Sequence, residues 1–357
     1  MAYTTIDDPT AYFQTKTYTG SAGAQSITFD GNSDLQPDWI WIKERGAAGG
    51  HVVTDTVRGI SASSAPFLQP SSTGAEIDGN GTVANRTLTS SNTNGFTLGQ
   101  DAYYTNFNNN SDTYVSWNWK AGGSSSTNTD GSQNTTVSVN TTAGFSIVKW
   151  TGADSTGSLG HGLGAVPKMI IAKRLATRNW TVYHVAMGAN KKLFLNTTAA
   201  ETSIADFDAT PTSSVINVGY TDDANGSGSD YIGYAFAEKQ GYSKFGSYTG
   251  NGNADGTFVY TGFKPAFIMT KSSATTSNWE IKDNKRLGYN PVDTYIKANA
   301  TAAEDTGVSS HAMDFLSNGF KHKGNNDEVN GSGEAYIYMA FAENPFVTST
   351  GVPATAR

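Results

Sequence analysis

A motif that opens with proline and closes with lysine six residues later occurs three times in this chain of 357 residues. An almost entirely apolar run lies between its two ends, and such a run is typical of a strand covered on both faces. The three copies are Pro37–Lys43, Pro167–Lys173 and Pro265–Lys271. Repetition at such long intervals predicts that one structural unit recurs along the chain.

Two further signatures accompany the motif in each copy. An aromatic-Thr-Gly triplet precedes it, beginning at Tyr18, Trp150 and Tyr248, and an aromatic-rich segment follows it. The three following segments are Tyr114–Trp119, Tyr231–Phe236 and Tyr336–Phe341. The distance from the proline to the first tyrosine of that segment is 77, 64 and 71 positions. This length predicts three small domains rather than the units of a solenoid.

The composition favours strands over helices. Charged residues make up only 15% of the chain, while Asn-Gly and Asp-Gly turn dipeptides are frequent and no stretch has a sustained helical periodicity. We therefore predict an all-β chain of three tandem antiparallel β-sandwich modules with a jelly-roll or lectin-like topology.

The repeat also predicts the domain boundaries. The segment from 121 to 143 is rich in Gly, Ser, Thr and Asn, which is the composition of a linker, although Val137 to Val139 could form a short strand. The predicted units are an N-terminal arm (1–17), module 1 (18–120), the linker (121–143), module 2 (144–238), module 3 (246–343) and an extended C-terminal tail (344–357).

Several classes of function lack their usual sequence signals. The chain has no cysteine, so disulfides and thiolate metal sites are excluded. Its net charge of -7 and its lack of basic runs longer than two residues argue against nucleic-acid binding. No signal peptide, membrane-length apolar run, Walker motif, nucleophile elbow or zincin motif is present. We therefore predict no enzyme activity, no cofactor and no membrane insertion.

The polar residues that recur are given structural interpretations. Asp55–Arg58 in module 1 matches Asp283–Arg286 in module 3, whereas module 2 has His184–Met187 at this place, and we expect each Asp-Arg pair to shape a turn. The recurring Glu76, Glu201 and Glu304 are expected to make solvated loop contacts. His51 and His184 lie at roughly corresponding positions of the repeat. The five histidines, His51, His161, His184, His311 and His322, are interpreted as loop or strand-surface residues.

Metal and glycan sites rest on weaker patterns. Asp222–Gly226 and Asn325–Glu328 offer oxygen ligands for calcium but lack EF-hand spacing, so no metal site is predicted. Tyr103 and Tyr104, in a polar loop unique to module 1, could stack on sugar rings. Trp180 and Trp279 could do the same, although a tryptophan in an alternating strand also suits a core. These four aromatic residues are the predicted glycan or receptor contacts.

Nearly the whole chain resembles a repeated domain of structural proteins from tailed bacteriophages, of the tail-fibre-like type found in phages of marine bacteria and cyanobacteria. The segments that carry the resemblance are Gly160–Ala165, Pro167–Lys173, Gly241–Gly252, Tyr336–Glu343 and Asn344–Gly351. The resemblance implies concanavalin-like β-sandwich modules in a virion component that is assembled in the host cytoplasm. It implies no active-site residue.

Two functions follow from the repeat and the resemblance. The first is a surface appendage such as a tail fibre or spike that binds a host glycan or receptor. The alternative is a non-enzymatic head decoration, cement protein or tail adaptor, which the non-repeated ends suggest. A depolymerase ranks below both, because clustered carboxylates on a β-helix are not visible. The expected partners are other virion proteins and a host surface glycan, and the chain is expected to self-associate, as a trimer.

Overall fold

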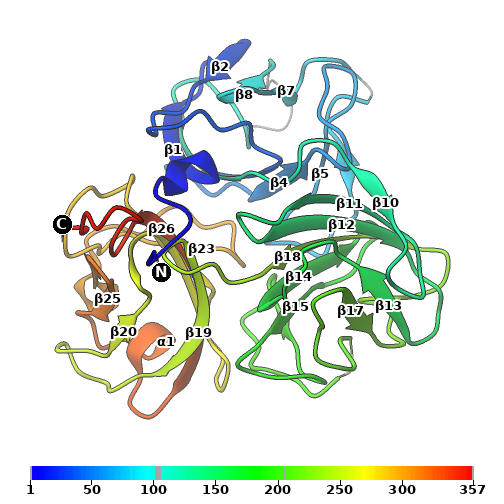
Figure 1. Cartoon of the computed structure of the whole chain (residues 1–357). Coiled ribbons are helices and arrows are strands. Elements are labelled where there is room, and N and C mark those ends of the chain that lie inside the picture. Colours follow the sequence, from blue (N-terminus) through cyan, green and yellow to red (C-terminus); the bar gives the residue numbers. More distant parts are fainter. Residues whose placement is uncertain (1, 82, 101–105, 205, 356–357) are drawn as a thin grey trace.

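Three lobes surround a common centre in the computed structural model, which describes residues 2–81, 83–100, 106–204 and 206–355 (Figure 1). We call them the first lobe (13–119), the second lobe (126–236) and the third lobe (243–345). The described residues form antiparallel strands with only three helical turns, so the all-β prediction is confirmed. Within this part of the chain, no helix has the length and apolar character needed to cross a membrane.

One large sheet forms the inner layer of each lobe, and four of its strands have the same order every time. The order is β1-β9-β3-β4 in the first lobe, β12-β18-β14-β15 in the second and β19-β26-β21-β22 in the third. The strands are β1 (Phe13–Thr19), β9 (Thr113–Trp119), β3 (Trp39–Glu44), β4 (Val52–Asp55), β12 (Phe145–Thr151), β18 (Asp230–Phe236), β14 (Met169–Arg174), β15 (Trp180–His184), β19 (Ser243–Thr249), β26 (Ala335–Pro345), β21 (Phe263–Ser272) and β22 (Glu280–Asp283). The first, last and lysine-bearing strands of each repeat are thus neighbours in space.

Edge strands and smaller sheets complete each lobe. The large sheets continue with β10 (Ser126–Asn128), β11 (Thr135–Asn140) and β16 (Leu193–Phe194) in the second lobe and β23 (Ile296–Lys297) in the third. The smaller sheets contain β2 (Gln25–Ile27), β8 (Gly95–Leu98) and β7 (Leu88–Asn92); β5 (Pro66–Phe67) and β6 (Ile77–Asp78); β13 (Gly157–Gly160) and β17 (Val215–Val218); and β20 (Phe258–Tyr260), β25 (Gly319–His322) and β24 (Met313–Leu316). The helical turns are η1 (Pro9–Ala11), η2 (Ser309–His311) and α1 (Asp327–Asn330).

The lysine-bearing strands are buried on both faces, as their continuous apolar runs predict. In β3, Trp39 and Trp41 join a core cluster shared by all three lobes. Ile40 and Ile42 point the other way, into a cluster confined to the first lobe. Successive side chains alternate across a strand, so a strand between two apolar layers has no polar face. The second and third lobes have cores of their own in the same way.

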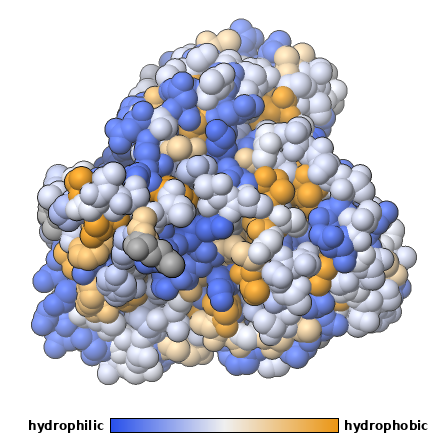
Figure 2. Space-filling view, in the orientation of Figure 1, coloured by the Kyte–Doolittle hydropathy of each residue, from blue (hydrophilic) through white to orange (hydrophobic). Residues whose placement is uncertain are grey.

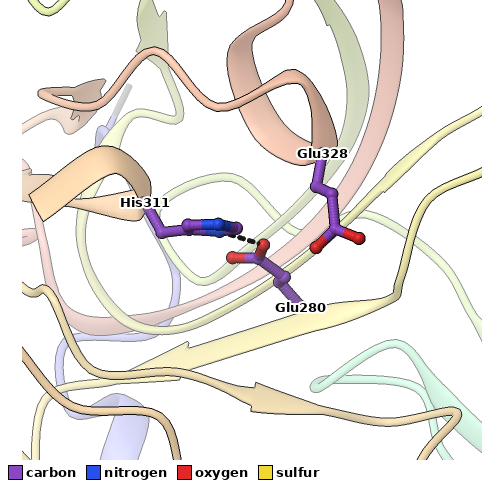
Figure 3. Close-up of side chains that lie close together, drawn as sticks. All are labelled: Glu280, His311 and Glu328. Carbon is purple, nitrogen blue, oxygen red and sulfur yellow. Dashed lines mark hydrogen bonds and ion pairs between the residues drawn. The ribbon is translucent and has the colours of Figure 1, made fainter. Parts of the chain in front are cut away.

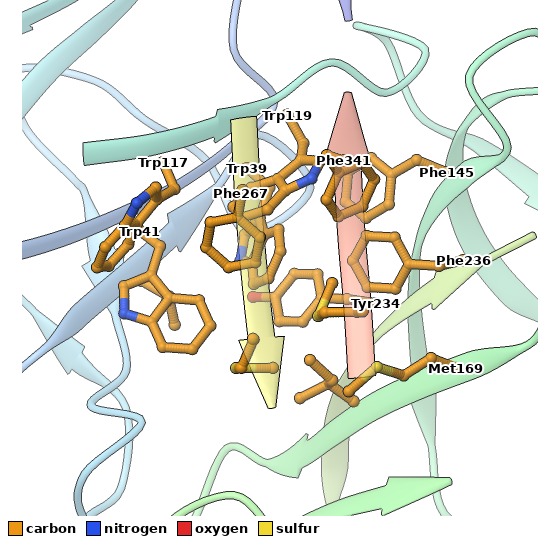
Figure 4. Close-up of a cluster of buried hydrophobic side chains, with 14 of the residues drawn as sticks. Trp39, Trp41, Trp117, Trp119, Phe145, Met169, Tyr234, Phe236, Phe267 and Phe341 are labelled. Atoms are coloured by element: carbon orange, nitrogen blue, oxygen red, sulfur yellow. The ribbon is translucent and has the colours of Figure 1, made fainter. Parts of the chain in front are cut away.

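Aromatic rings from the three lobes meet at the centre of the molecule (Figure 4). Trp119, Phe236 and Phe341 occupy the same position of their strands and contact one another pairwise. Their ring centroids are 5.5 Å apart for Trp119 and Phe341, 5.9 Å for Phe236 and Phe341, and 6.5 Å for Trp119 and Phe236. Each such ring buries a large apolar area, so this centre holds the lobes together.

The glycine of each aromatic-Thr-Gly triplet is explained by a close approach of the backbone. A Cβ atom at Gly20 would come within 2.0 Å of the Asn109 carbonyl oxygen. The second and third copies, Gly152 and Gly250, would meet loop carbonyl oxygens at 2.2 and 2.3 Å. No real Cβ atom is accommodated at such distances, so only glycine lets the opposing loop pack at this point.

The segment predicted to be a linker is largely part of the second sheet. β10 pairs with β11, and β11 pairs with β12, so the polar stretch adds two strands at one end of the sheet, with β10 at the edge. Val137 lies in the core of the second lobe, which gives β11 an apolar anchor despite its polar composition. The linker prediction is therefore wrong for 126–128 and 135–140, whereas the suggested strand near Val137 is confirmed.

Both ends of the chain pack on the third lobe (Figure 1). The Tyr3 hydroxyl donates to the Gly262 carbonyl oxygen at 2.8 Å, and Ile6 is buried in the shared core. The Ser349 amide donates to Asp7 Oδ1 at 2.6 Å, which joins the tail to the arm. The N-terminal arm is shorter than the predicted range of 1–17, because β1 already begins at Phe13.

Candidate functional site

The described side chains converge most regularly where the lobes meet. We call these places the first junction (first and second lobes), the second junction (second and third lobes) and the third junction (third and first lobes). A recurring glutamate donates its backbone amide to a loop carbonyl of the neighbouring lobe at each of them. The pairs are Glu76 to Leu175 at 2.7 Å, Glu201 to Ser273 at 2.9 Å and Glu304 to Arg45 at 2.9 Å. The same contact thus closes all three junctions.

A ring nitrogen makes a second contact at each junction. Trp180 Nε1 donates to the Gln69 carbonyl oxygen and Trp279 Nε1 to that of Phe194, both at 3.0 Å. His51 makes the equivalent contact with the Lys297 carbonyl oxygen at 3.0 Å. Because Trp41 Nε1 donates to His51 Nδ1, the proton of the neutral His51 ring is on Nε2, which therefore donates.

This arrangement corrects the predicted glycan contacts. The Trp180 and Trp279 side chains are fully buried in the shared core, with exposures of 0% and 1%, so neither presents a ring face to a sugar. The core alternative for these two residues is the one that the structure supports. Tyr103 and Tyr104, the other two predicted contacts, lie outside the described residues.

The first junction contains a buried ion pair. Arg58 Nε donates to Asp55 Oδ2 at 2.6 Å, and Arg58 Nη1 donates to Glu76 Oε2 at 3.1 Å. From the second lobe, the Tyr234 hydroxyl donates to the same Asp55 oxygen at 2.9 Å. The Arg58 and Asp55 side chains are almost completely buried, so the pair is shielded from solvent and salt. The Asp-Arg motif therefore shapes its own turn and also binds the next lobe.

The third junction repeats this geometry with a different aromatic donor. Arg286 Nε donates to Asp283 Oδ2 at 2.6 Å, and Trp117 Nε1 of the first lobe donates to that oxygen at 3.0 Å. Glu304 accepts from Arg286 and also forms two hydrogen bonds with Arg45. The positive charge of Arg286 contributes to holding the pKa of Asp283 below its usual value, although burial opposes this. The expectation of solvated loop contacts is wrong for Glu304, which is paired and nearly buried.

The second junction lacks the ion pair and is closed mainly by apolar side chains. His184 replaces the aspartate, and Met187, which packs against the shared core, replaces the arginine. In the facing strand, Met339 has the register position of Trp117 and Tyr234. Where the aspartate is absent, its hydrogen-bond donor is absent too. Besides the Trp279 contact described above, His184 Nε2 crosses this junction and donates to the Tyr338 carbonyl oxygen at 3.2 Å.

All five histidines are buried, which contradicts the prediction that they lie in loops or on strand surfaces. Burial lowers the pKa of His51 to about 3 and that of His184 to about 4, because a charged imidazole is not solvated in an apolar interior. His51 corresponds to Trp180 and Trp279 and not to His184, so their expected correspondence is wrong as well.

The lysine that ends each motif is also buried. Lys173 Nζ donates to the carbonyl oxygens of Arg174 and Ala176 at 2.5 and 2.7 Å, and Lys43 and Lys271 reach equivalent loop carbonyls. Desolvation lowers the pKa of each of these lysines to about 8. Each ammonium fixes the loop after its strand, which explains why the motif ends in lysine.

A polar cluster lies inside the third lobe, away from the junctions (Figure 3). Glu280 comes from β22, His311 from η2 and Glu328 from α1, and one ligand atom of each lies within 4.8 Å of the others. His311 Nδ1 is 2.5 Å from Glu280 Oε1, and Asn278 Nδ2 donates to Glu328 Oε1 at 2.6 Å. The Tyr295 ring stacks on His311 with a centroid distance of 4.5 Å.

The polar cluster at the corresponding position of the second lobe contains a lysine. Lys192 Nζ lies 2.7 Å from Asp206 Oδ2 and 2.9 Å from Asp223 Oδ2. Thr181 Oγ1 donates to the same Asp206 oxygen at 2.6 Å. Thr181 and Glu280 each follow a junction tryptophan, and Lys192 and Tyr295 each precede a two-residue edge strand. The two lobes therefore differ in how the negative charge at this place is balanced.

Sequence reasoning missed the cluster in the third lobe and the partners across the junctions. Glu328 lies in an acidic segment that was considered for calcium, but Glu280 and His311 are 31 residues apart and share no motif. The recurrence of Asp55 and Asp283 can be seen in the sequence. Their aromatic hydrogen-bond donors cannot, because they come from strands of a neighbouring lobe and the sequence does not specify which lobes meet. One correlation in the sequence could have indicated these partners. Trp117 and Tyr234 occur where the facing lobe has an aspartate, whereas Met339 occurs where the facing lobe has His184.

A model of a family described as a domain of unknown function (DUF7483) matches residues 8–345. No curated protein and no solved structure is similar to the chain. The match spans all three lobes and ends with β26, so the family corresponds to the complete three-lobed arrangement. The chain therefore belongs to the DUF7483 family of domains of unknown function.

Proposed function

We propose that this protein is a non-enzymatic structural component of a bacteriophage particle, built from three tandem β-sandwich modules. The observation that carries the proposal is the closed set of three like junctions around one aromatic core. A head-to-tail interface that returns to its start after three units forms a closed ring. Here one chain supplies the whole ring, which makes it a rigid block with approximate threefold symmetry.

This arrangement suits a structural role better than catalysis. The arginines, aspartates and glutamates at the junctions are engaged with one another and with the neighbouring lobe. The visible face carries small, separate hydrophobic patches among polar side chains (Figure 2). We propose that the block decorates a phage particle or joins parts of it. It would bind at positions of threefold or pseudo-threefold symmetry.

The closed ring also bears on self-association. A homotrimer built on lobe contacts would need free lobe surfaces, but each lobe already meets two others within the chain. A trimer of chains, which the sequence analysis expects, therefore has to use surfaces other than the lobe junctions. We propose that a single copy acts as the three-lobed unit, and light scattering on the purified chain distinguishes one chain from three.

A second candidate function is a surface appendage that binds a host glycan or receptor. Three outward-facing tyrosines favour it, because exposed aromatic rings are common in sugar and protein contacts. Tyr220, Tyr260 and Tyr289 have exposures of 64%, 52% and 67%. They take the place of the buried Trp180 and Trp279 as candidates for such contacts.

Cryo-electron microscopy of the phage that encodes the chain tests both functions. The structural role predicts density for all three lobes seated on capsid or tail protein, with the outer tyrosines in contact with virion subunits. The appendage role predicts the same lobes at a distal tip, and a glycan array then shows binding that Tyr260→Ala and Tyr289→Ala reduce. If mass spectrometry finds no such chain in purified particles, both proposals fail.

A further inference from the structure

We propose that the third lobe binds one divalent transition-metal ion of the Zn²⁺ type through Glu280, His311 and Glu328. The three side chains come from β22, η2 and α1, and their nearest ligand atoms are mutually within 4.8 Å (Figure 3). The site is independent of the proposed role in a phage particle. The proposed metal binding concerns the third lobe alone.

The donor set favours zinc over the hard cations. One imidazole nitrogen with two carboxylate oxygens is a ligand combination that Zn²⁺ takes, whereas Ca²⁺ and Mg²⁺ prefer oxygen ligands throughout. Zinc bonds to these atoms are about 2 Å long, so the ligands of one ion lie roughly 3 to 4 Å apart. The cluster therefore needs only a small rearrangement, in which the ion takes the place of the hydrogen bond between His311 and Glu280.

The second lobe gives an internal comparison. There the ammonium of Lys192 lies between Asp206 and Asp223, within 2.9 Å of an oxygen of each. The two carboxylates of the second lobe are thus neutralised by a lysine that lies between them. In the third lobe the residue at the lysine position is Tyr295, whose ring stacks beside His311. The ammonium at this place comes instead from Lys282, whose Nζ lies 3.6 Å from Glu280 Oε2 and 4.7 Å from the centroid of the Tyr295 ring.

The hydrogen bonds around the cluster are incomplete. Among the described residues, Glu280 Oε2 and Lys282 Nζ have no hydrogen-bond partner, although both are buried. They are 3.6 Å apart, which is too far for a hydrogen bond. Buried polar atoms of this kind are uncommon in native proteins and often mark an ion or water site. Glu280 Oε2 is therefore held only by its ion pair with Lys282, and a metal ion can bind its remaining lone pairs.

An ion can reach the cluster from solvent. A surface pocket next to α1 is lined by Glu328 itself and by two further acidic residues, Asp327 and Glu334. Its other lining residues, Thr275, Thr276 and Ser332, are small and polar. A negatively charged entrance raises the local concentration of cations. Once bound, the ion would join β22, η2 and α1.

Calorimetric titration of the full chain with Zn²⁺, after dialysis against a chelator, tests the proposal. We expect one ion per chain and a higher midpoint of thermal unfolding with zinc than without. His311→Ala and Glu328→Gln should each weaken binding by at least 10- to 100-fold, the loss typical even of outer-shell changes. A Ca²⁺ titration under the same conditions should show no comparable site.

Tyr295→Lys is the sharpest variant, because it reproduces the arrangement of the second lobe. The new ammonium should pair with Glu328 and abolish zinc binding, while circular dichroism remains that of the wild type. Asp223→Asn, at the Glu328 position of the second lobe, should leave the zinc affinity unchanged. If the wild type takes up no zinc, or if His311→Ala and Asp223→Asn bind it equally well, the site is not the one proposed.

Discussion

The first and second junctions join their lobes by the same backbone and ring contacts but differ in one buried interaction. At the first junction, Asp55 and Arg58 form an ion pair that Tyr234 completes from the neighbouring lobe. At the second, the corresponding His184 and Met187 face a strand with Met339. Both junctions close, so the buried ion pair is not required for lobe packing.

The difference shows that the junction residues change as a set. An aspartate is matched by an aromatic N–H or O–H donor, and its absence is matched by methionine, so neither version leaves an unpaired charge. Buried ion pairs often contribute little compared with a well-packed apolar alternative, but removing one partner is costly. The following changes test this interpretation, from the largest expected effect to the smallest.

Arg58→Met should destabilise the protein most, because it leaves the Asp55 carboxylate buried without its counter-ion. We expect a loss of about 3–5 kcal/mol in the free energy of unfolding, measured in urea. Arg178→Met is the matched control, since Arg178 pairs with Asp222 on the exposed surface and should cost about 0–1 kcal/mol. Equal losses from the two variants would mean that burial does not set the strength of this ion pair.

Converting the first junction into the second type should recover most of that loss. The variant Asp55→His, Arg58→Met and Tyr234→Met replaces the ion pair and its donor together. We expect its stability to be closer to the wild type than that of Arg58→Met alone, with a coupling of about 0.5–3 kcal/mol. If the losses of the three single variants simply add up, the residues do not act as a set.

Acid should weaken the second junction through His184. Its folded pKa of about 4 lies below the ordinary value of 6.5, so the unfolded chain binds the extra proton first. The contribution of the neutral His184 to the free energy of unfolding is complete above pH 6.5. It is lost at about 1.4 kcal/mol per pH unit as the pH falls towards 4. Urea unfolding at pH 7.5, 5.5 and 4.5 measures it, and His184→Gln should reduce the slope. His51 adds a similar slope that this variant leaves in place.

Trp180→Phe and Trp279→Phe test the contact that all junctions share. Each keeps a large ring but leaves a carbonyl oxygen, of Gln69 or Phe194, without its indole donor. We expect a cost of about 1–3 kcal/mol for each, and similar values for both because their surroundings correspond. A much larger effect at Trp279 would show that the second junction depends more on this bond because it lacks the ion pair.

Much of the fold was predictable because its signals are local. The continuous apolar run from Trp39 to Ile42 correctly indicated a strand covered on both faces. The turn dipeptides and the aromatic segments indicated an all-β chain. Composition alone is misleading, since the polar stretch that contains Val137 forms two paired strands at one end of a sheet. Backbone pairing at an edge needs few apolar side chains.

The candidate sites were harder to predict because they depend on which strands face one another. Trp180 was compatible with a core or with a glycan platform until the neighbouring lobe provided Gln69 as its partner. The sequence predicts surface positions for the histidines, because a single polar residue carries no information on what covers it. Glu280 and His311 show no pattern at all in the sequence, and η2 brings them together.

By itself the sequence determined the strand content and the threefold repetition. These features follow from side-chain periodicity and from backbone sterics, which act over a few residues. The tertiary structure decided that the repeats close on one another and share the core of Trp119, Phe236 and Phe341. It also decided which buried charges are paired, because desolvation and hydrogen bonding depend on neighbours that come from distant parts of the chain.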